Sequence, residues 1–350
     1  MKILVTAAKT GGHIFPAIAV GSDLIKNGHE VIFLGSGAEI ERNALKDTNL
    51  SYFSIQMEGY RGKGLLAKIK ALLLIPKSIY STAALIKKEK IDAMIGFGGF
   101  ITVPSGIACF LMRKPLFTHE QNSIHGSANK LLSKIAKINF LGFPLNSNLK
   151  NEVISGNPIR DTFISSPDKL DLVEREAINI YVTGGSQGSE YINNNIPIAF
   201  KNSPYQINIK HQCGVNKLDS VIELYSKTKI NFEVREFYKH PENLIEWSDF
   251  IISRSGALSI SEITSMSKGI LMIPLPSSID NHQFYNAKHI ESINMGIIHL
   301  EESGEAALEE KISNIISQNL FKKWKENNNK DHIMAAQTIS KKVIESLDVK

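Results

Sequence analysis

One pattern occurs twice in this sequence and constrains its fold more than any other feature. It consists of a short apolar run, a Thr-Gly-Gly turn and a segment with apolar residues at helical spacing; the two turns are Thr10–Gly12 and Thr183–Gly185. A buried strand followed by a glycine turn and a helix is the building unit of parallel α/β sheets, and its repetition indicates two similar domains. The sequence therefore predicts an α/β protein with two doubly wound domains that face a cleft.

Further apolar runs of strand length follow in both halves, separated by segments with helical periodicity. The predicted strands are Lys2–Thr6, Glu30–Leu34, Ser51–Gln56, Ala93–Gly96, Leu116–Thr118, Ile138–Phe143, Ile178–Val182, Ile207–His211, Phe232–Val234, Phe250–Ile252 and Ile270–Ile273. The polar stretch Ser165–Asp168 indicates a nearby domain boundary. We expect one domain over residues 1–160, a second over 161–320, and a helical tail over 321–350 that packs back on the first.

The composition limits the class of protein. Hydrophobic residues make up 43% and charged residues 21% of the chain, as in globular proteins, and a net charge of +5 is too weak to indicate nucleic-acid binding. Cys109 and Cys213 lack metal-ligand spacing, so we expect buried free thiols in a reducing cytosol. No apolar run approaches the ~20 residues of a membrane span, and the N-terminal run is too short for a signal peptide.

The stretch from Asp249 to Glu262 combines a predicted strand, a small-residue turn at Ser255–Gly256 and a helix that starts near Ala257. The N–H groups and the dipole of a helix N-terminus favour an anion, and Glu262 is placed to accept hydrogen bonds from a ribose diol. The stretch indicates a nucleotide site with a diphosphate at the turn. A solvated helix in an ordinary α/β unit is the alternative.

Polar residues and glycines gather where the predicted strands end, which is the ligand-binding edge of a parallel sheet. They are Thr10, Gly11, Gly12, His13, Gly98, Gly99, His119, Glu120, Gln121, Asn122, Arg160, Gly184, Gly185, Ser186, Gln187, Gly188, Arg254, Ser255, Glu262, Asp280, Gln283 and Asn286. The pattern contains neither a metal constellation, nor a nucleophile elbow, nor the lysine of a phosphate-binding loop. It fits metal-free transfer of a group from a nucleotide donor, with the leaving diphosphate stabilised by helix N-termini and Arg160.

Two residues are candidates for the general base of such a transfer. His13 opens the first helix, whose positive end disfavours protonation of an imidazole. Glu120 follows a predicted strand beside His119. Each has a structural alternative: His13 can hydrogen-bond its own turn, and Glu120 can cap the next helix.

The segment Leu65–Ile79 carries more apolar residues than one buried stripe requires. Lysines lie within and around it: Lys63, Lys68, Lys70, Lys77, Lys87 and Lys88. Surplus apolar surface beside basic residues suits docking on an anionic membrane face. A core helix whose lysine stems extend along its surface is the alternative.

Taken together, the motifs resemble those of the MurG family, the bacterial UDP-N-acetylglucosamine:undecaprenyl-diphospho-muramoylpentapeptide N-acetylglucosaminyltransferases. The matching segments, in the family's order, are Thr10-Gly11-Gly12-His13 with Phe15-Pro16-Ala17, Gly98-Gly99-Phe100, His119-Glu120-Gln121-Asn122, Gly156-Asn157-Pro158-Ile159-Arg160, Gly184-Gly185-Ser186-Gln187-Gly188, Arg254-Ser255-Gly256-Ala257-Leu258 with Ser261-Glu262, and His282-Gln283 with Asn286-Ala287. They extend over most of the chain.

The resemblance implies a GT-B fold of two Rossmann-like domains, the first facing acceptor and membrane and the second binding the UDP-sugar. It implies inverting transfer of N-acetylglucosamine from UDP-N-acetylglucosamine to the C4 hydroxyl of undecaprenyl-diphospho-N-acetylmuramoyl-pentapeptide, without metal or cofactor. It also implies a peripheral protein on the cytoplasmic face of the inner membrane, attached to the anionic surface through Leu65–Ile79 and the flanking lysines.

By motif match, the resemblance also implies the residues that bind substrate. They are Thr10, Gly11, Gly12, Asn122, Arg160, Gly185, Ser186, Tyr238, Ala257, Leu258, Ser259, Ile260, Ser261, Glu262 and Gln283. Ser186 would meet the diphosphate, Glu262 the ribose and Gln283 the sugar. Tyr238 would contact uracil through its backbone, and either His13 or Glu120 would take the acceptor's proton.

The sequence departs from the family at Ala8, Lys9 and Val103, where the family usually has glycine. All three fall in loops of the first domain, which would hold the acceptor. Two other functions stay open. One is a related GT-B transferase that acts on another lipid such as diacylglycerol, against which His119-Glu120-Gln121-Asn122 argues. The other is a nucleotide-sugar-binding protein without catalysis, which the three departures support.

Overall fold

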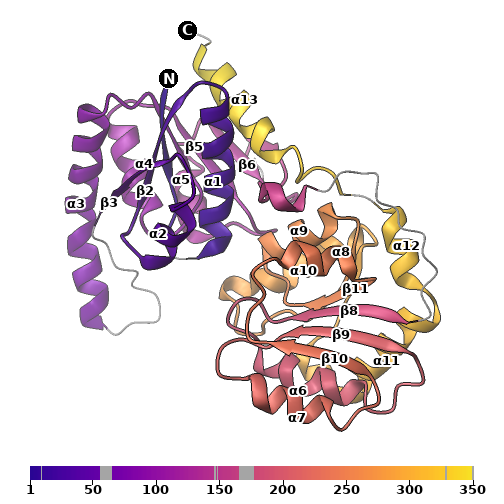
Figure 1. Ribbon diagram of the computed structural model, residues 1–350. Helices are drawn as coiled ribbons and strands as arrows, with labels where there is room; N and C mark the ends of the chain where they lie inside the picture. Colours follow the sequence, from indigo (N-terminus) through magenta and orange to yellow (C-terminus); the bar gives the residue numbers. More distant parts are fainter. Residues whose placement is uncertain are drawn as a thin grey trace. The chain divides into compact units, whose positions relative to one another are not determined.

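The computed structural model describes residues 1–8, 10–55, 65–145, 147, 149–164, 177–327 and 329–348, and within 65–73 it describes the backbone. The chain forms two compact units (Figure 1). Unit 1 comprises Met1–Asp161 and Asp331–Lys350, and unit 2 comprises Thr162–Lys330. Each unit is a parallel sheet covered by helices, so the prediction of two Rossmann-like domains is confirmed. The facing of the two domains across a cleft stays a prediction.

Unit 1 alternates strands and helices along the chain. Its elements are β1 Lys2–Thr6, α1 Gly11–Lys26, β2 Glu30–Gly35, α2 Glu39–Leu45, β3 Ser51–Ser54, α3 Leu65–Lys88, β4 Ala93–Gly96, α4 Thr102–Leu111, β5 Leu116–Glu120, α5 Ser127–Leu132, β6 Ile138–Leu141, β7 Glu152–Ile154, the 3₁₀ turn Asp161–Phe163 at the junction with unit 2, and α13 Ala335–Asp348. The strands lie in the order β3-β2-β1-β4-β5-β6-β7, with every pairing parallel.

The strands of unit 1 are apolar on both faces, as parallel strands between two helix layers must be. Ile3 and Val5 of β1 pack with α1, whereas Leu4 between them packs with α3 and α4 on the opposite face. Helix α13 lies beside α1 (Figure 1) and buries Ile339 and Val343 in the same cluster as Ile3. A C-terminal helix thus completes the core of the N-terminal unit.

Unit 2 repeats the arrangement. Its elements are β8 Ile178–Thr183, α6 Glu190–Ala199, β9 Ile207–Gln212, α7 Leu218–Tyr225, β10 Asn231–Arg235, α8 Pro241–Trp247, β11 Phe250–Ser253, α9 Ala257–Ser265, β12 Gly269–Met272, the 3₁₀ turn Ile279–Asn281, α10 His282–Ser292, β13 Gly296–Ile298, the 3₁₀ turn Glu301–Ser303, α11 Gly304–Ser317 and α12 Leu320–Glu326. The parallel strands lie in the order β10-β9-β8-β11-β12-β13. Helices α6, α7 and α11 cover one face and α8, α9 and α10 the other (Figure 1).

The predicted tail, residues 321–350, is divided between the units. Phe321 and Trp324 of α12 are buried in the core of unit 2, and a side chain on Gly269 would collide with the Trp324 ring. The chain then returns to unit 1, where the backbone N–H of Asn157 donates to Nδ1 of His332 at 2.8 Å. Gly156 has φ +76°, and a Cβ there would lie 2.4 Å from the carbonyl oxygen of Asp331, so only glycine allows this close approach.

Some predicted features lie outside the residues that the structure describes. They are Lys9, Gln56 at the end of the predicted strand Ser51–Gln56, Lys63, the side chains of 65–73 within the proposed membrane segment, and the predicted boundary stretch Ser165–Asp168. Among the helices that are described, none combines the length and apolar character that crossing a bilayer requires. Cys109 and Cys213 are buried free thiols, as predicted.

Candidate active site

In both sheets the strand order reverses between the first and fourth strands of the unit, which are β1 and β4 in unit 1 and β8 and β11 in unit 2. Loops leave the carboxyl ends of two such strands in opposite directions, and the crevice between them is where open α/β sheets bind ligands. The predicted site residues follow these four strands or their neighbours. Each unit therefore carries one candidate ligand-binding edge.

In unit 1, the turn after β1 leads into α1, whose third residue is His13. Thr10 Oγ1 lies 3.2 Å from His13 Nδ1. A Cβ placed on Gly98, after β4, would lie 2.9 Å from Cδ2 and 3.0 Å from Nε2 of the His13 ring. The imidazole is thus held between its own turn and the glycine backbone of the neighbouring loop, with Nδ1 toward Thr10 and Nε2 beside Gly98.

Phe15, at the start of the second turn of α1, lies against two other predicted residues, Gly11 and Arg160. A Cβ on Gly11 would lie 2.9 Å from the Phe15 ring, whereas one on Gly12 would meet only Thr10 Oγ1 at 3.8 Å. The guanidinium of Arg160 stacks 5.0 Å above the centroid of the same ring. Phe15 therefore brings Arg160, distant in sequence, to the helix start that carries His13.

Glu120, the other candidate base, is 3% exposed and accepts four hydrogen bonds from the loop that follows it and from α5. The backbone N–H and side-chain amide of Asn122 donate to Oε1 at 3.1 and 3.0 Å. The N–H of Gly126, the N-cap of α5, and the amide of Asn129 donate to Oε2 at 2.8 and 2.9 Å. The carboxylate thereby shapes the loop and caps α5, which is the structural alternative that the sequence left open.

His119 and Gln121 belong to a buried network that joins strand ends. The amide of Gln121 donates to the carbonyl of Phe97 at 2.9 Å and lies 3.1 Å from His119 Nδ1, while His119 Nε2 lies 3.0 Å from the carbonyl oxygen of Gly156. Burial lowers the pKa of His119 to about 4. A neutral imidazole that donates through Nε2 and accepts through Nδ1 satisfies every one of these contacts, so His119 is a structural residue.

In unit 2, the residues Gly184–Gly188 after β8, here called the β8 turn, form a tight loop before α6. Gly185 and Gly188 have φ of +86° and +70°. A Cβ on Gly188 would lie 1.8 Å from the carbonyl oxygen of Cys213, whereas a Cβ on Gly185 would meet nothing within 4 Å. Ser186 is exposed. The inner side of the turn is closely packed and its outer side, at Gly185 and Ser186, is open.

Helix α9 starts at Ala257, as predicted, with Gly256 as N-cap. The first N–H to find a helical partner is that of Ile260, which donates to Gly256 at 3.1 Å, so the preceding N–H groups have none within the helix. A Cβ on Gly256 would meet nothing within 4 Å, so this helix end is open. Glu262 follows on the same helix and is 5% exposed.

The other predicted residues of α9 differ in what they can offer. Ser259 is exposed, and Ala257 and Leu258 are buried at the helix start. Ile260 is fully buried in the core, and the Ser261 hydroxyl donates back to the carbonyl of Ala257 at 2.8 Å. The Ile260 side chain is therefore part of the core, and the Ser261 hydroxyl bonds to the backbone of its own helix.

Arg254, which precedes this helix, is one of the polar residues that the sequence places at a strand end. In the structure its guanidinium donates to the carbonyl of Ile273 at 3.0 Å and pairs with Glu301 Oε1 at 2.5 Å. It thus holds the loop after β12. The N–H of Leu275 in that loop donates to the side-chain oxygen of Gln283 at 3.0 Å, and the hydroxyl of Ser255 donates to the Gln283 carbonyl at 2.8 Å. These contacts hold the Gln283 side-chain oxygen against the loop after β12, so its NH₂ group is the end of the amide that can donate to a ligand.

Sequence reasoning missed Gln212, the last residue of β9. Its amide donates to the carbonyl of Gly185 at 2.9 Å, and its oxygen accepts from the backbone N–H of Tyr238 at 2.9 Å. The predicted backbone contact of Tyr238 to uracil would therefore use its carbonyl. The position directly before Cys213-Gly214, at the end of a predicted strand, was the available signal.

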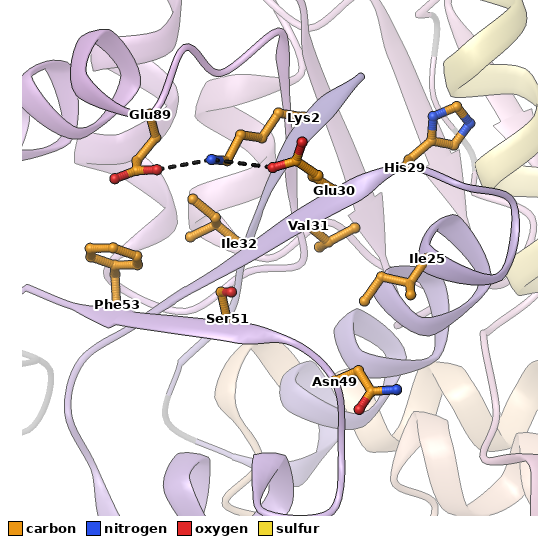
Figure 2. Close-up of a pocket in the computed structure, with 10 residues that line it drawn as sticks. All are labelled: Lys2, Ile25, His29, Glu30, Val31, Ile32, Asn49, Ser51, Phe53 and Glu89. Carbon is orange, nitrogen blue, oxygen red and sulfur yellow. Dashed lines mark hydrogen bonds and ion pairs between the residues drawn. The ribbon is translucent and has the colours of Figure 1, made fainter.

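A cavity of about 470 Å³ lies at the opposite edge of the unit 1 sheet, where β1, β2 and β3 begin (Figure 2). The Lys2 ammonium lies there between Glu89 at 2.9 Å and Glu30 at 3.4 Å. None of the predicted site residues lines this cavity, so we do not place the active site there. Within the described ranges, no group of three His, Cys, Asp or Glu side chains is arranged to hold a metal ion.

Comparison with known proteins adds to this geometry. Residues 3–140 match the glycosyltransferase family 28 N-terminal domain, and residues 179–343 match its C-terminal domain. The chain is 35% identical over 315 residues to the UDP-N-acetylglucosamine–N-acetylmuramyl-(pentapeptide) pyrophosphoryl-undecaprenol N-acetylglucosamine transferase of Cellvibrio japonicus, covering 88% of this chain and 87% of that one. It is 35% identical over 307 residues to the protein of that name from Coxiella burnetii, covering 86% of each.

A solved structure gives the same result. The crystal structure of Acinetobacter baumannii MurG superposes with a TM-score of 0.83 at 28% identity, over 98% of this chain and 99% of that one. A UDP-GlcNAc 2-epimerase from Neisseria meningitidis, solved with UDP-GlcNAc bound, has a TM-score of 0.70 at 15% identity, over 99% of this chain and 100% of that one. The second likeness shows a shared fold.

Proposed function

This chain belongs to the family of UDP-N-acetylglucosamine–N-acetylmuramyl-(pentapeptide) pyrophosphoryl-undecaprenol N-acetylglucosamine transferases, and on that premise we propose that it transfers N-acetylglucosamine from UDP-N-acetylglucosamine to the C4 hydroxyl of undecaprenyl-diphospho-N-acetylmuramoyl-pentapeptide. The observation that carries the proposal is the ligand-binding edge of unit 2. There a glycine turn with an open outer side and an open helix N-terminus follow adjacent strands, in a chain similar to these transferases over most of its length.

We assign the donor to unit 2. The outward N–H group of Ser186 and the start of α9 supply donors for a diphosphate, whereas the N–H of Gly185 donates to Thr183 Oγ1 at 3.0 Å. Glu262 accepts hydrogen bonds from the ribose, and Gln283 donates through its NH₂ group to a hydroxyl of the sugar. Because the N–H groups at the turn and at the helix start belong to the folded backbone before the donor binds, they stabilise the negative charge that develops on the departing UDP.

The reaction consists of one bond made and one broken. The acceptor's C4 oxygen attacks the anomeric carbon, the bond to the diphosphate oxygen breaks with its electron pair leaving on UDP, and the configuration inverts. We assign the acceptor's proton to His13. In the tautomer whose Nδ1–H donates to Thr10 Oγ1, Nε2 carries the lone pair that accepts this proton. Glu120 is the weaker candidate because four donors already occupy its carboxylate oxygens. The predicted roles of Thr10–Gly12, Asn122 and Arg160 stay predictions.

We also propose that unit 1 attaches to the cytoplasmic face of the inner membrane, because the acceptor is a lipid. Tyr80 of α3, Phe110 and Leu111 of α4, and Leu131 of α5 are between 53% and 76% exposed. These three helices pack in sequence, and exposed basic residues accompany the apolar ones: Lys77, Arg113, Lys130 and Lys134. Exposed aromatic and aliphatic side chains beside lysines suit an anionic bilayer surface.

One assay tests the function against both alternatives. Radiolabelled UDP-N-acetylglucosamine is offered with lipid-linked muramoyl-pentapeptide, with diacylglycerol, or without acceptor, and both labelled lipid and released UDP are measured. We expect one UDP per sugar transferred, with the muramoyl lipid alone. Transfer to diacylglycerol would instead identify the related lipid transferase, and donor binding without transfer would identify a non-catalytic protein.

The variant Glu262→Ala tests the ribose assignment by its affinity for UDP. Hydrogen bonds to a charged group contribute about 1.5–3 kcal/mol, so the loss of the ribose contacts should weaken UDP binding by about tenfold or more. An unchanged UDP affinity in this variant would refute the ribose assignment while leaving the transfer reaction itself untouched.

A further inference from the structure

Three loops lie in contact at the carboxyl edge of unit 2, in the order of the strands from which they come. The β8 turn is one. Residues Gln212–Gly214, here called the β9 loop, come next, and residues Arg235–Tyr238, the β10 loop, follow. A Cβ on Gly214 would lie 2.3 Å from the carbonyl oxygen of Gln187 in the β8 turn. On its other side the β9 loop donates to the β10 loop: the N–H of Cys213 donates to the carbonyl of Arg235 at 3.0 Å, and the N–H of Gly214 donates to the carbonyl of Glu236 at 3.1 Å.

Gln212 spans all three loops with its side chain. Its Nε2 donates to the carbonyl of Gly185 at 2.9 Å and lies 3.4 Å from Thr183 Oγ1, and its Oε1 accepts the N–H of Tyr238 at 2.9 Å. The amide orientation follows from its partners, because a carbonyl needs a donor and an N–H needs an acceptor. Gln212 is 5% exposed, so neither group has ready access to water as a substitute.

This contact determines where the β8 turn points its donors. In a trans peptide the C=O of one residue and the N–H of the next point in opposite directions. The Gly185 carbonyl is held inward by Gln212 and by the N–H of Gly188 at 3.0 Å, so the N–H of Ser186 must point outward. The outward side is the open one, since a Cβ on Gly185 would meet nothing within 4 Å.

We propose that Gln212 is a positioning residue for the donor: it fixes the Gly185–Ser186 peptide so that the Ser186 N–H meets the diphosphate, and it ties that peptide to the loop that contacts the base. The inference rests on the proposed function, since it assigns the diphosphate to the β8 turn. Gln212 touches no reacting atom. We expect Gln212 to affect the difference in binding free energy between UDP and uridine, which is the contribution of the diphosphate.

The experiment therefore compares the affinity for UDP with that for uridine, by titration calorimetry or competition, in the full-length protein. The ratio of the two dissociation constants reports the contribution of the diphosphate. Gln212→Met and Gln212→Ala remove the donor to Gly185 without adding charge, and we expect this ratio to fall by about fivefold or more. In Gln212→Glu an oxygen still accepts from Tyr238, so uridine affinity should stay within about twofold while the ratio falls further.

Gln206→Met is the matched control, because Gln206 is exposed at the amino end of the same strand and should leave the ratio unchanged. Retained uridine binding shows that unit 2 of each variant is folded. A ratio that falls only in Gln212→Glu would overturn the proposal, since charge repulsion alone would explain it, and so would an unchanged ratio in the neutral variants. If the unsubstituted protein binds UDP no more tightly than uridine, the donor assignment fails instead.

Discussion

His13 and Glu120 both carry a group that can accept a proton, but their surroundings differ. The carboxylate of Glu120 accepts four hydrogen bonds from the loop that follows it and from α5, whereas His13 Nδ1 lies 3.2 Å from Thr10 Oγ1 and its Nε2 lies beside Gly98. A base must exchange its proton during each turnover, and a carboxylate that caps a helix and orders a loop has to break those bonds to do so. Residue environment, rather than residue type, separates the two.

The paired variants His13→Ala and Glu120→Gln test this separation. We expect His13→Ala to lower kcat by about 10²–10⁴ with little change in the KM for the donor, which is the usual contribution of a general base. Glu120→Gln places an NH₂ group against two donors, so it should destabilise unit 1 by roughly 2–3 kcal/mol and raise the KM for the acceptor. Steady-state kinetics and thermal melting measure both. A stable Glu120→Gln protein with the larger loss of kcat would reverse the assignment.

At the scale of single residues, the sequence predicts position better than role. It places His13, Glu120 and Arg254 at strand ends and helix starts, where the structure has them. It cannot show that Arg254 is engaged by Ile273 and Glu301, because those partners are brought close only by the order of strands in the sheet. Gln212 stays hidden for the same reason.

The β8 turn and the β9 loop show how one element depends on another. Gly185 and Gly188 both have positive φ, yet only Gly188 is pressed against a neighbouring backbone. Conformational strain is common to both glycines, whereas lack of space is specific to Gly188. A substitution at Gly188 should therefore affect mainly the stability of the turn, whereas a substitution at Gly185 should affect mainly its proposed ligand-binding surface.

We expect Gly185→Ala and Gly188→Ala to have opposite profiles. Gly185→Ala adds about 1–2 kcal/mol of backbone strain, which lowers the melting temperature of unit 2 by roughly 3–6 °C, but its methyl group projects where the diphosphate is proposed to lie. UDP affinity should therefore fall more than stability. In Gly188→Ala the methyl would overlap the Cys213 carbonyl, so we expect the larger loss of thermal stability. Equal melting temperatures would show that the turn adapts to the added methyl.

Element prediction succeeded where apolar runs are long enough to show a period. The strands β1 and β4 have the predicted bounds, and α9 starts at the predicted residue. The three-residue strands β7 and β13 and the short helix α2 were not predicted, because so few residues carry no usable periodicity. Helix α1 begins at Gly11, earlier than the start at Ile14 that the apolar spacing indicates, because its first residues, Gly11-Gly12-His13, carry no apolar side chain to show the helical period.

At the scale of the whole molecule, the notable feature is that unit 1 is made from both ends of the chain. The repeated strand–turn–helix pattern predicts two domains. The apolar spacing of a C-terminal amphipathic helix shows which face is buried, but it does not show which element covers that face. The structure shows the partner to be α1, with Ile339 and Val343 fully buried in the cluster that also holds Ile3.

The double variant Ile339→Ala with Val343→Ala tests this dependence in the full-length protein. A buried Ile→Ala change alone costs about 2–5 kcal/mol, so unit 1 should become protease-sensitive and transferase activity should fall. UDP affinity should remain within about threefold, because the core of unit 2 contains neither residue. Lys341→Ala, an exposed change on the same helix, is the control. Proteolytic cuts confined to residues 162–330 would contradict the division into units.

The return of the chain to unit 1 also determines the order in which the two units can finish folding during synthesis on the ribosome. Synthesis begins at Met1, so seven strands of unit 1 emerge first, yet the face of α1 that α13 covers must stay bare until residues 335–348 have left the exit tunnel. Unit 2 has all its residues by Lys330 and can complete its core earlier. The unit that is translated first is therefore the last to complete its core. While unit 2 is being synthesised, the apolar face of α1 is exposed, and chaperones can bind it.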